Sequence, residues 1–328
     1  MSDLDTDSLR TKVLLTAGRW DLAAVLTMTM FVALVALSLF APTPMRDVFE
    51  QGDALWTLFT SLMLGVITAV VLVGTFNQLV LSQELGALGD QRERMEAATK
   101  FRADTQEWME GGVSPPTPAA FLRELLAAVE RTADHVHVAA GRDERERAQE
   151  VAEFGERVAD EAGEVQADLA DADFGSFDMI AAALRFDYSW EIYQIHRFRV
   201  MYADALNDDT LGALTDLSTV LQLYAPAREH FKTTYFQWDL MNLSRGMLYT
   251  SVPALTVSIG MTLYVDATAF AGSLGGIDAI VVLVAGAVAI SLMPFFLFLS
   301  YVIRIATIAK RTLAIGPFIL TDVDETTE

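Results

Sequence analysis

Four long stretches of this chain contain no aspartate, glutamate, lysine or arginine, and they constrain its fold more than any other feature. They cover residues 22–41, 54–81, 247–265 and 279–303. A helix needs about 20 mostly apolar residues to cross the hydrocarbon core of a bilayer. The alternative for the first stretch is a signal peptide, but it is long for one and Pro42 stands where cleavage would be expected. The sequence therefore predicts an all-α, polytopic membrane protein with four transmembrane helices.

The remaining residues divide into a cytoplasmic N-terminal segment, an acidic helical cytoplasmic domain inserted between spans two and three, and a C-terminal cytoplasmic tail. These parts cover residues 1–21, 82–246 and 304–328, around the transmembrane hairpins 22–81 and 247–303. Lysine and arginine near span ends favour the cytoplasmic side. The short loops within the hairpins contain only Arg46, whereas ten basic residues flank the other span ends: Arg10, Lys12, Arg19, Arg92, Arg94, Lys232, Arg245, Arg304, Lys310 and Arg311. We therefore expect a multi-pass protein of the cell membrane with both termini in the cytoplasm.

Two long helices are expected to lead from the spans into the inserted domain. Span two continues in helical pattern to about Met109, where glycines and prolines end it. The second helix covers residues 225–264 and starts near Pro226, since proline is tolerated in a first turn. It passes through Arg245 into span three. The domain is thus predicted to be continuous with the membrane part.

Between them, the apolar spacing predicts helices over residues 119–140, from Ser176 to about Tyr202, and over residues 211–224 with Thr210 as the cap. Residues 141–173 are charge-dense and carry few large apolar side chains. For this segment a solvated helix and disorder both remain open.

The charge of the chain is strongly acidic, at −21, and it is concentrated in residues 82–246, which hold 31 acidic and 16 basic residues. Lysine occurs only four times, against 19 arginines. An acidic, lysine-poor surface fits a solvent of high salt, where repulsion between carboxylates is screened. The alternative is a docking surface for a basic protein partner in the cytoplasm. Binding to nucleic acid is not expected of such a surface.

A stripe of small or polar residues runs along span two at spacings of three or four. It comprises Ser61, Gly65, Thr68, Leu72, Thr75 and Gln78. Small residues let helices approach closely in a membrane, so that helix packing is one interpretation. The other is the pore face of an oligomer with a constriction near Leu72. Spans three and four carry weaker stripes, and Pro253 and Pro294 are candidate kinks in these two spans.

Several classes of function are not expected. No span has an ionisable side chain such as Asp, Glu, Lys, Arg or His in its interior, which argues against proton-coupled transport but not against a passive channel. Common enzyme motifs are missing, so that we predict no catalytic residues and no enzyme. The chain has no cysteine, and its few histidines are poorly spaced for a metal. We therefore expect no metal site and no cofactor.

The layout resembles the bestrophin and bestrophin-like family, which has four spans, cytoplasmic termini and a helical cytoplasmic region between spans two and three, and in which span two lines the pore. Near the C-terminus, Gly316-Pro317-Phe318 followed by Asp322 and Asp324 is similar to the Pro-Phe-Gly and acidic run after the last bestrophin span, although Ile319 replaces the glycine. The insertion before a final span pair also resembles MotA/ExbB-type proton-channel subunits, whose Gly- and Thr-rich late spans are not matched. In its composition the chain looks like a haloarchaeal membrane protein.

Two hypotheses follow for the function. The first is a homo-oligomeric, bestrophin-like ion channel in the lipid bilayer, with span two lining the pore. The second is a membrane-anchored scaffold or signalling adaptor whose cytoplasmic helices bind a protein partner, in which case the stripe of span two serves packing alone.

Overall fold

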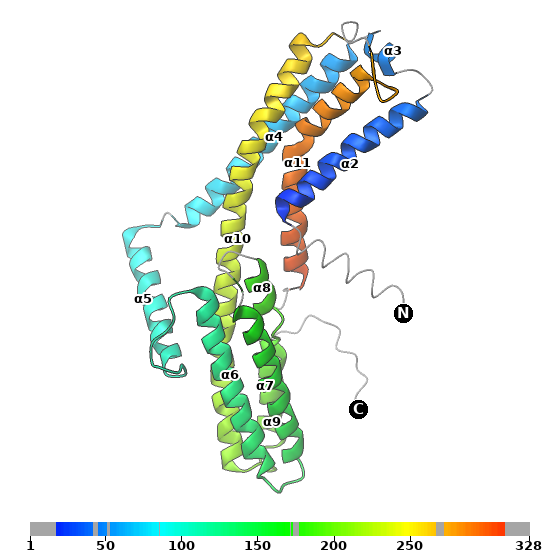
Figure 1. Cartoon of the computed structure of the whole chain (residues 1–328). Helices are drawn as coiled ribbons and strands as arrows, with labels where there is room; N and C mark the ends of the chain where they lie inside the picture. The colour runs from blue at the N-terminus through cyan, green and yellow to red at the C-terminus, as the bar shows by residue number, and fades with distance from the viewer. Residues whose placement is uncertain are drawn as a thin grey trace. The chain divides into compact units, whose positions relative to one another are not determined.

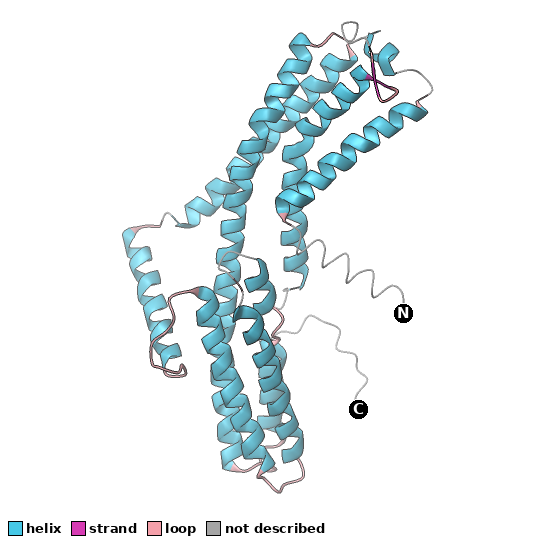
Figure 2. Ribbon diagram, viewed as in Figure 1, coloured by secondary structure: helices cyan, strands magenta, loops and turns pink. Residues whose placement is uncertain are grey.

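The computed structural model describes residues 18–41, 45–50, 53–84, 86–170, 172, 177–266 and 272–311. The chain is mostly helical, as predicted (Figure 2), and Figure 1 shows the order of its elements. It divides into two compact units, which we describe separately. Among the described residues, those up to 84 and from 237 to 308 form the first unit, and those from 86 to 236 and from 309 to 311 form the second.

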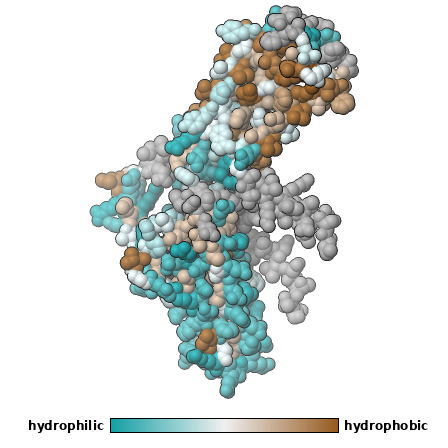
Figure 3. Space-filling model, in the orientation of Figure 1, coloured by the Kyte–Doolittle hydropathy of each residue, from teal (hydrophilic) through white to brown (hydrophobic). Residues whose placement is uncertain are grey.

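Four helices are long and apolar enough to cross a membrane, and we call them the spanning helices. They are α2 (Arg19–Phe40), α4 (Ala54–Glu84), α10 (Asp208–Tyr264) and α11 (Ala279–Arg311). Each covers one of the four charge-free stretches predicted above to within one residue. In Figure 3, apolar residues gather over these helices in the first unit, while hydrophilic residues cover the second unit.

Two clusters of buried side chains hold the first unit together. One joins α4 to α10 and α11 through residues such as Phe59, Met261 and Ile280. The other brings Ala23 of α2 against Leu297 and its neighbours on α11. Apolar packing of this kind, rather than water exclusion, holds helices together in a lipid environment.

The connections inside the two helix pairs are short. Helix α3 (Met45–Glu50) lies between α2 and α4. Between α10 and α11, strands β1 (Ser273–Leu274) and β2 (Ile277–Asp278) pair antiparallel, with Gly275 and Gly276 at positive φ in the turn. Glycine is favoured there because a two-residue hairpin turn of this type needs positive φ at both positions. This small hairpin is an addition to the predicted all-α fold.

A bidentate ion pair joins the two connections. Arg46 donates from Nε and Nη2 to the two carboxylate oxygens of Asp278, at 2.7 Å each. These hydrogen bonds hold the pKa of Asp278 below its usual value. The loop after α2 is therefore attached to the residue that immediately precedes α11.

In the second unit, the charge-dense segment forms a well-packed helix. Helix α7 (Ala148–Ala170) buries a face of alanine, valine and glycine against α6 (Pro118–Gly141), which matches the predicted helix over residues 119–140. The two backbones approach closely, since a Cβ on Gly155 would lie 2.7 Å from the amide nitrogen of His137. Small side chains thus replace the large apolar ones whose scarcity had left disorder open for residues 148–170.

The remaining helices of this unit are α5 (Leu88–Gln106), α8 (Phe177–Ala183), α9 (Tyr188–Met201) and the first part of α10. Arg157 of α7 donates to the buried Glu191 of α9, with Nη1 2.8 Å from Oε1. Burial raises the pKa of Glu191, and the neighbouring Arg157 opposes that rise.

Three predicted boundaries were wrong. The helix of span two does not continue to Met109: α4 ends at Glu84, and Ala87 is in an extended conformation before α5 begins. Gly86 lies at this break and Gly89 lies in the first turn of α5. Glycine destabilises a continuous helix because its backbone loses more conformational freedom than that of other residues. The helix expected from Ser176 to Tyr202 is split between α8 and α9, with Asp187 capping α9. Ser176 itself lies outside the described residues.

The third correction concerns the predicted helix over residues 225–264 and the separate one before it. They are one helix, α10, which starts at Asp208 and contains Pro226 in its interior. Proline removes one backbone hydrogen bond, and Tyr224 and Ala227, which are buried on either side of it, keep the helix packed. The cap is Asn207, whose side-chain oxygen accepts from the Thr210 amide at 2.7 Å.

Candidate functional site on the second spanning helix

Helix α4 has one face that packs inside the first unit. Leu55, Phe59, Val66 and Val73 are buried on it, at spacings of four or seven residues. That spacing returns to the same side of a helix. These four side chains belong to the two apolar clusters or lie between them, so that this face is occupied by the other spanning helices of the same chain.

The predicted stripe lies on a different face. All six of its residues are exposed: Ser61, Gly65, Thr68, Leu72, Thr75 and Gln78. A side chain added at Gly65 would meet nothing within 4 Å. Within one copy of the chain, therefore, the stripe does not serve to pack α4 against the described helices.

The hydroxyl groups of the stripe bond to their own helix. Ser61 donates to the Thr57 carbonyl oxygen at 2.7 Å, Thr68 to the Leu64 oxygen at 2.8 Å, and Thr75 to the Leu72 oxygen at 2.6 Å. Each hydroxyl proton is thereby used within α4, and the oxygen lone pairs stay available on the surface. The three hydroxyl groups thus offer acceptors rather than donors to whatever covers the stripe, while the exposed Gln78 amide can do both.

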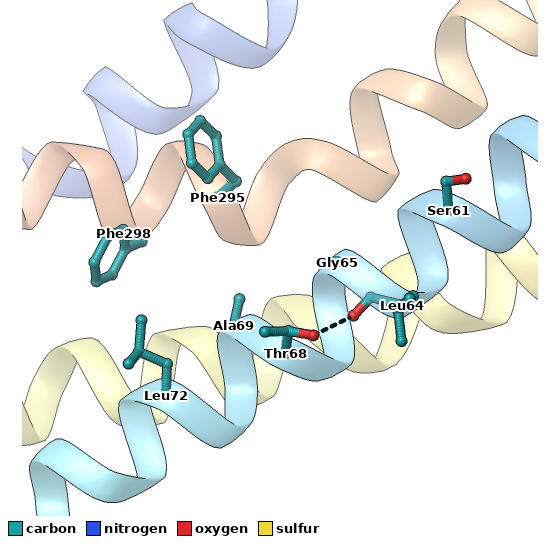
Figure 4. A pocket seen from close by; sticks show the side chains of 8 residues that line it. All are labelled: Ser61, Leu64, Gly65, Thr68, Ala69, Leu72, Phe295 and Phe298. Carbon is teal, nitrogen blue, oxygen red and sulfur yellow. Dashed lines mark hydrogen bonds between the residues drawn. The ribbon is translucent and has the colours of Figure 1, made fainter.

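An open cavity of about 520 Å³ lies over the middle of the stripe (Figure 4). Its walls come from α4 and α11: Ser61, Leu64, Gly65, Thr68, Ala69, Leu72, Phe295 and Phe298. Sequence reasoning did not find Phe295 and Phe298, because nothing in the spacing of one helix shows which residues of another helix lie beside it. The Phe-Phe pair that follows Pro294 was the available signal.

The two candidate kinks lie inside continuous helices. Helix α10 continues through Pro253, which is exposed, and α11 continues through Pro294, which is buried next to the exposed Phe295. Asn77, one residue before Gln78, has a buried side-chain oxygen that finds no hydrogen-bond partner in the described part of the chain. Whether these positions act in a pore stays a prediction.

No group of three or more His, Cys, Asp or Glu side chains suited to a metal ion occurs among the described residues. The α4 face and its cavity also hold no charged side chain. The arrangement is therefore suited to contact with lipid, with another helix or with a water-filled path, and it offers no obvious acid–base chemistry.

Comparison with known proteins gives one match. A family model described as "Family of unknown function (DUF7972)" covers residues 2–328. No curated protein and no solved structure matches the chain. The resemblance to bestrophins and the halophilic character thus stay predictions.

Proposed function

The chain belongs to the DUF7972 family, whose function is unknown, and from the geometry of α4 we propose that it is a membrane protein that assembles from identical copies into a passive ion channel. In this proposal α4 lines the pathway, and both termini and residues 82–246 are cytoplasmic. The single observation that carries it is the exposure of a polar stripe on a helix apolar enough to cross a membrane.

The contrast with α2 supports this assignment. The exposed side chains of α2 are largely apolar and suit lipid, as Val25, Val32 and Phe40 illustrate. On α4 the exposed stripe contains Ser61, Thr68, Thr75 and Gln78 instead. Polar side chains in spans usually face a protein interior or a water-filled cavity, because hydrocarbon offers no partner for them. Facing other copies around a central path would satisfy this preference.

The absence of charged residues from the middle of the spans favours passive conduction. Proton-coupled carriers usually keep a charged group or a histidine at mid-membrane, and the four charge-free stretches contain no Asp, Glu, Lys, Arg or His. Threonine and serine oxygens with an apolar narrowing at Leu72 are the elements expected of a simple pore with a hydrophobic gate.

Cysteine labelling tests the proposal, since the chain has no native cysteine. Thr68→Cys places a thiol on the stripe, and Ile67→Cys places one on the adjacent exposed apolar part of α4. In reconstituted bilayers, a charged methanethiosulfonate reagent should change the current through Thr68→Cys and leave Ile67→Cys unaffected. Mass measurement in mild detergent should show several copies per particle. Monomers that conduct nothing, or equal effects at both positions, would contradict the channel.

The scaffold or adaptor hypothesis retains one specific observation. Helix α9 exposes Tyr193, Val200 and Met201, a set of large side chains that a solvated helix does not need. A cytoplasmic protein partner could bind there. If the protein is silent in bilayers, and if Val200→Asp abolishes a cellular phenotype while Thr68→Cys does not, the adaptor function is preferred.

A further inference from the structure

A buried ion pair joins the spanning helices of the first unit away from the α4 stripe. Arg19, the first residue of α2, places Nη2 2.5 Å from Oδ1 of Asp239 on α10. The Asp239 side chain is only 4% exposed. The same guanidinium lies over the ring of Tyr301 on α11, 4.6 Å from its centre. Three spanning helices therefore meet at one carboxylate.

A second cation shares that carboxylate. Arg304, one turn beyond Tyr301 on α11, is 5% exposed and interacts electrostatically with Asp239. The other oxygen of Asp239, Oδ2, is buried without a hydrogen-bond partner in the described ranges. A buried carboxylate is stable only when neighbouring charges compensate for its lost hydration. Here both compensating arginines belong to helices other than α10.

Few buried side chains attach α2 to its neighbours. Ala23 is its one buried side chain in the described residues, and Leu26 and Met30 pack only partly against the cluster around Leu297. Gly18, before the first turn, provides no side-chain cap. Further along α2, Leu34 packs partly against the cluster around Phe59 that α4, α10 and α11 share. Ala23 alone is buried on α2 among the described residues, so that loss of the ion pair should affect the start of α2 most.

We propose that Asp239 acts as a latch: its carboxylate holds the start of α2 against α10 and α11, and neutralising it releases α2 while the other three spanning helices stay packed. Asp239 is a positioning residue in this device, because it acts through the placement of α2. The inference does not depend on ion conduction.

Release of α2 would also change the packing behind the cavity over the stripe. Leu26 and Met30 of α2 pack against the same cluster as Ala69 and Phe298, and these two residues also line the cavity. Undocking would remove support from behind the cavity wall. The latch thus offers a route by which the N-terminal helix alters the α4 face.

Distance measurements between spin labels test the latch in the full chain, reconstituted in lipid nanodiscs. Leu37→Cys, near the end of α2, and Ile259→Cys on α10 are exposed labelling positions. Adding Asp239→Asn should lengthen and broaden the distance distribution. Ser244→Ala is the matched control, because Ser244 is buried on α10 and its hydroxyl bonds only to the Leu240 carbonyl of the same helix. An unchanged distribution in Asp239→Asn would overturn the proposal.

A second pair of variants decides the matter if Asp239→Asn does not fold. Ala23→Cys puts a thiol at a fully buried position of α2. With Arg19→Gln added, its alkylation by a water-soluble maleimide should speed up about tenfold or more, because local opening exposes it. Arg19→Lys, which keeps the charge, should restore most of the protection. Equal rates in Arg19→Gln and the parent would show that the ion pair does not hold α2.

Discussion

Two parts of the spanning unit are built from the same kinds of residue, yet the chain buries one and exposes the other. Where α10 meets α11, Ser258 and Ser291 are buried with their hydroxyl oxygens 2.9 Å apart, and Ala254 of α10 and Ala289 of α11 are buried as well. On α4, a stripe of similar composition faces outward. We call the first part the α10–α11 seam and the second the α4 stripe.

Small and hydroxyl-bearing residues therefore indicate a helix surface that avoids lipid. They do not indicate which partner covers that surface. In the seam, a second helix of the same chain supplies the cover, since Ser258 of the weaker stripe on span three contacts Ser291 of α11. On α4 no described helix does so. If the same rule holds there, the cover comes from outside the copy, as the proposed assembly requires.

The largest expected effect comes from filling the close contact beside the seam. A Cβ at Gly246 would lie 2.7 Å from Cδ2 of Leu297, and Leu297 is fully buried and cannot move aside freely. Gly246→Leu should therefore destabilise the protein by roughly 3 kcal/mol, as overpacking does. Thermal unfolding in detergent, followed by tryptophan fluorescence, measures the loss.

Gly65→Leu is the matched control, because a side chain there meets nothing within 4 Å. It should leave the melting temperature of the single copy nearly unchanged while reducing the number of copies per particle. Equal destabilisation by both substitutions would mean that the α4 stripe is already covered within one chain, and the contrast between the two parts would disappear.

A smaller effect is expected from removing the hydroxyl pair of the seam. Ser258→Ala deletes the bond to Ser291, but the Ser291 hydroxyl keeps its bond to the Ala287 carbonyl at 2.8 Å. The cost should therefore be about 0.6 kcal/mol, the usual size of such bonds between spans. A double-mutant cycle with Ser291→Ala isolates it. Thr68→Val on the α4 stripe should lower the free energy of unfolding by less than this. A coupling energy of zero between Ser258 and Ser291 would show that shape complementarity alone holds the seam.

The sequence predicted the spanning helices well, because the length of a charge-free stretch is a direct physical requirement for crossing lipid. It also identified the residues of the α4 stripe, since helical spacing determines which residues share a face. It could not show which face meets other helices. Phe295 and Phe298 join the cavity from a helix more than 200 residues further on, and no local pattern encodes that contact.

The other wrong predictions come from glycine and proline, whose effect on a helix depends on the packing around them. Gly86 and Gly89 lie in the stretch predicted to be one continuous helix, but that helix is interrupted there, whereas Pro226 was predicted to stand near a helix start and lies inside α10. In each case the surrounding packing decided the outcome: α5 has almost no buried face, and α10 has buried residues on both sides of its proline. The pair between Arg19 and Asp239 was missed because the two residues are 220 positions apart.

The smallest expected effect concerns the ion pair between Arg46 and Asp278. It joins the connection before α4, which carries the stripe, to the connection between α10 and α11, which form the seam. The hydrogen bonds from Arg46 lower the pKa of Asp278 from its ordinary value of 3.8. A lowered carboxyl pKa means that the pair stabilises the fold fully above that ordinary value and loses its contribution as the pH falls through the lowered one. Arg46→Gln should remove this contribution, and because the pair is partly exposed, the melting temperature should drop by only about 1 °C.

Melting temperatures of wild type and Arg46→Gln, compared between about pH 6 and about pH 3, measure this dependence. The difference should stay constant over the upper part of the range and shrink below pH 3.8. Arg92→Gln is the control, because Arg92 forms an exposed pair with Glu96 within one helix and joins no two segments. A difference that persists unchanged at the acid end would show that Arg46 stabilises the loops by packing rather than by its charge. The relative placement of the α4 stripe and the seam would then depend on the apolar clusters alone.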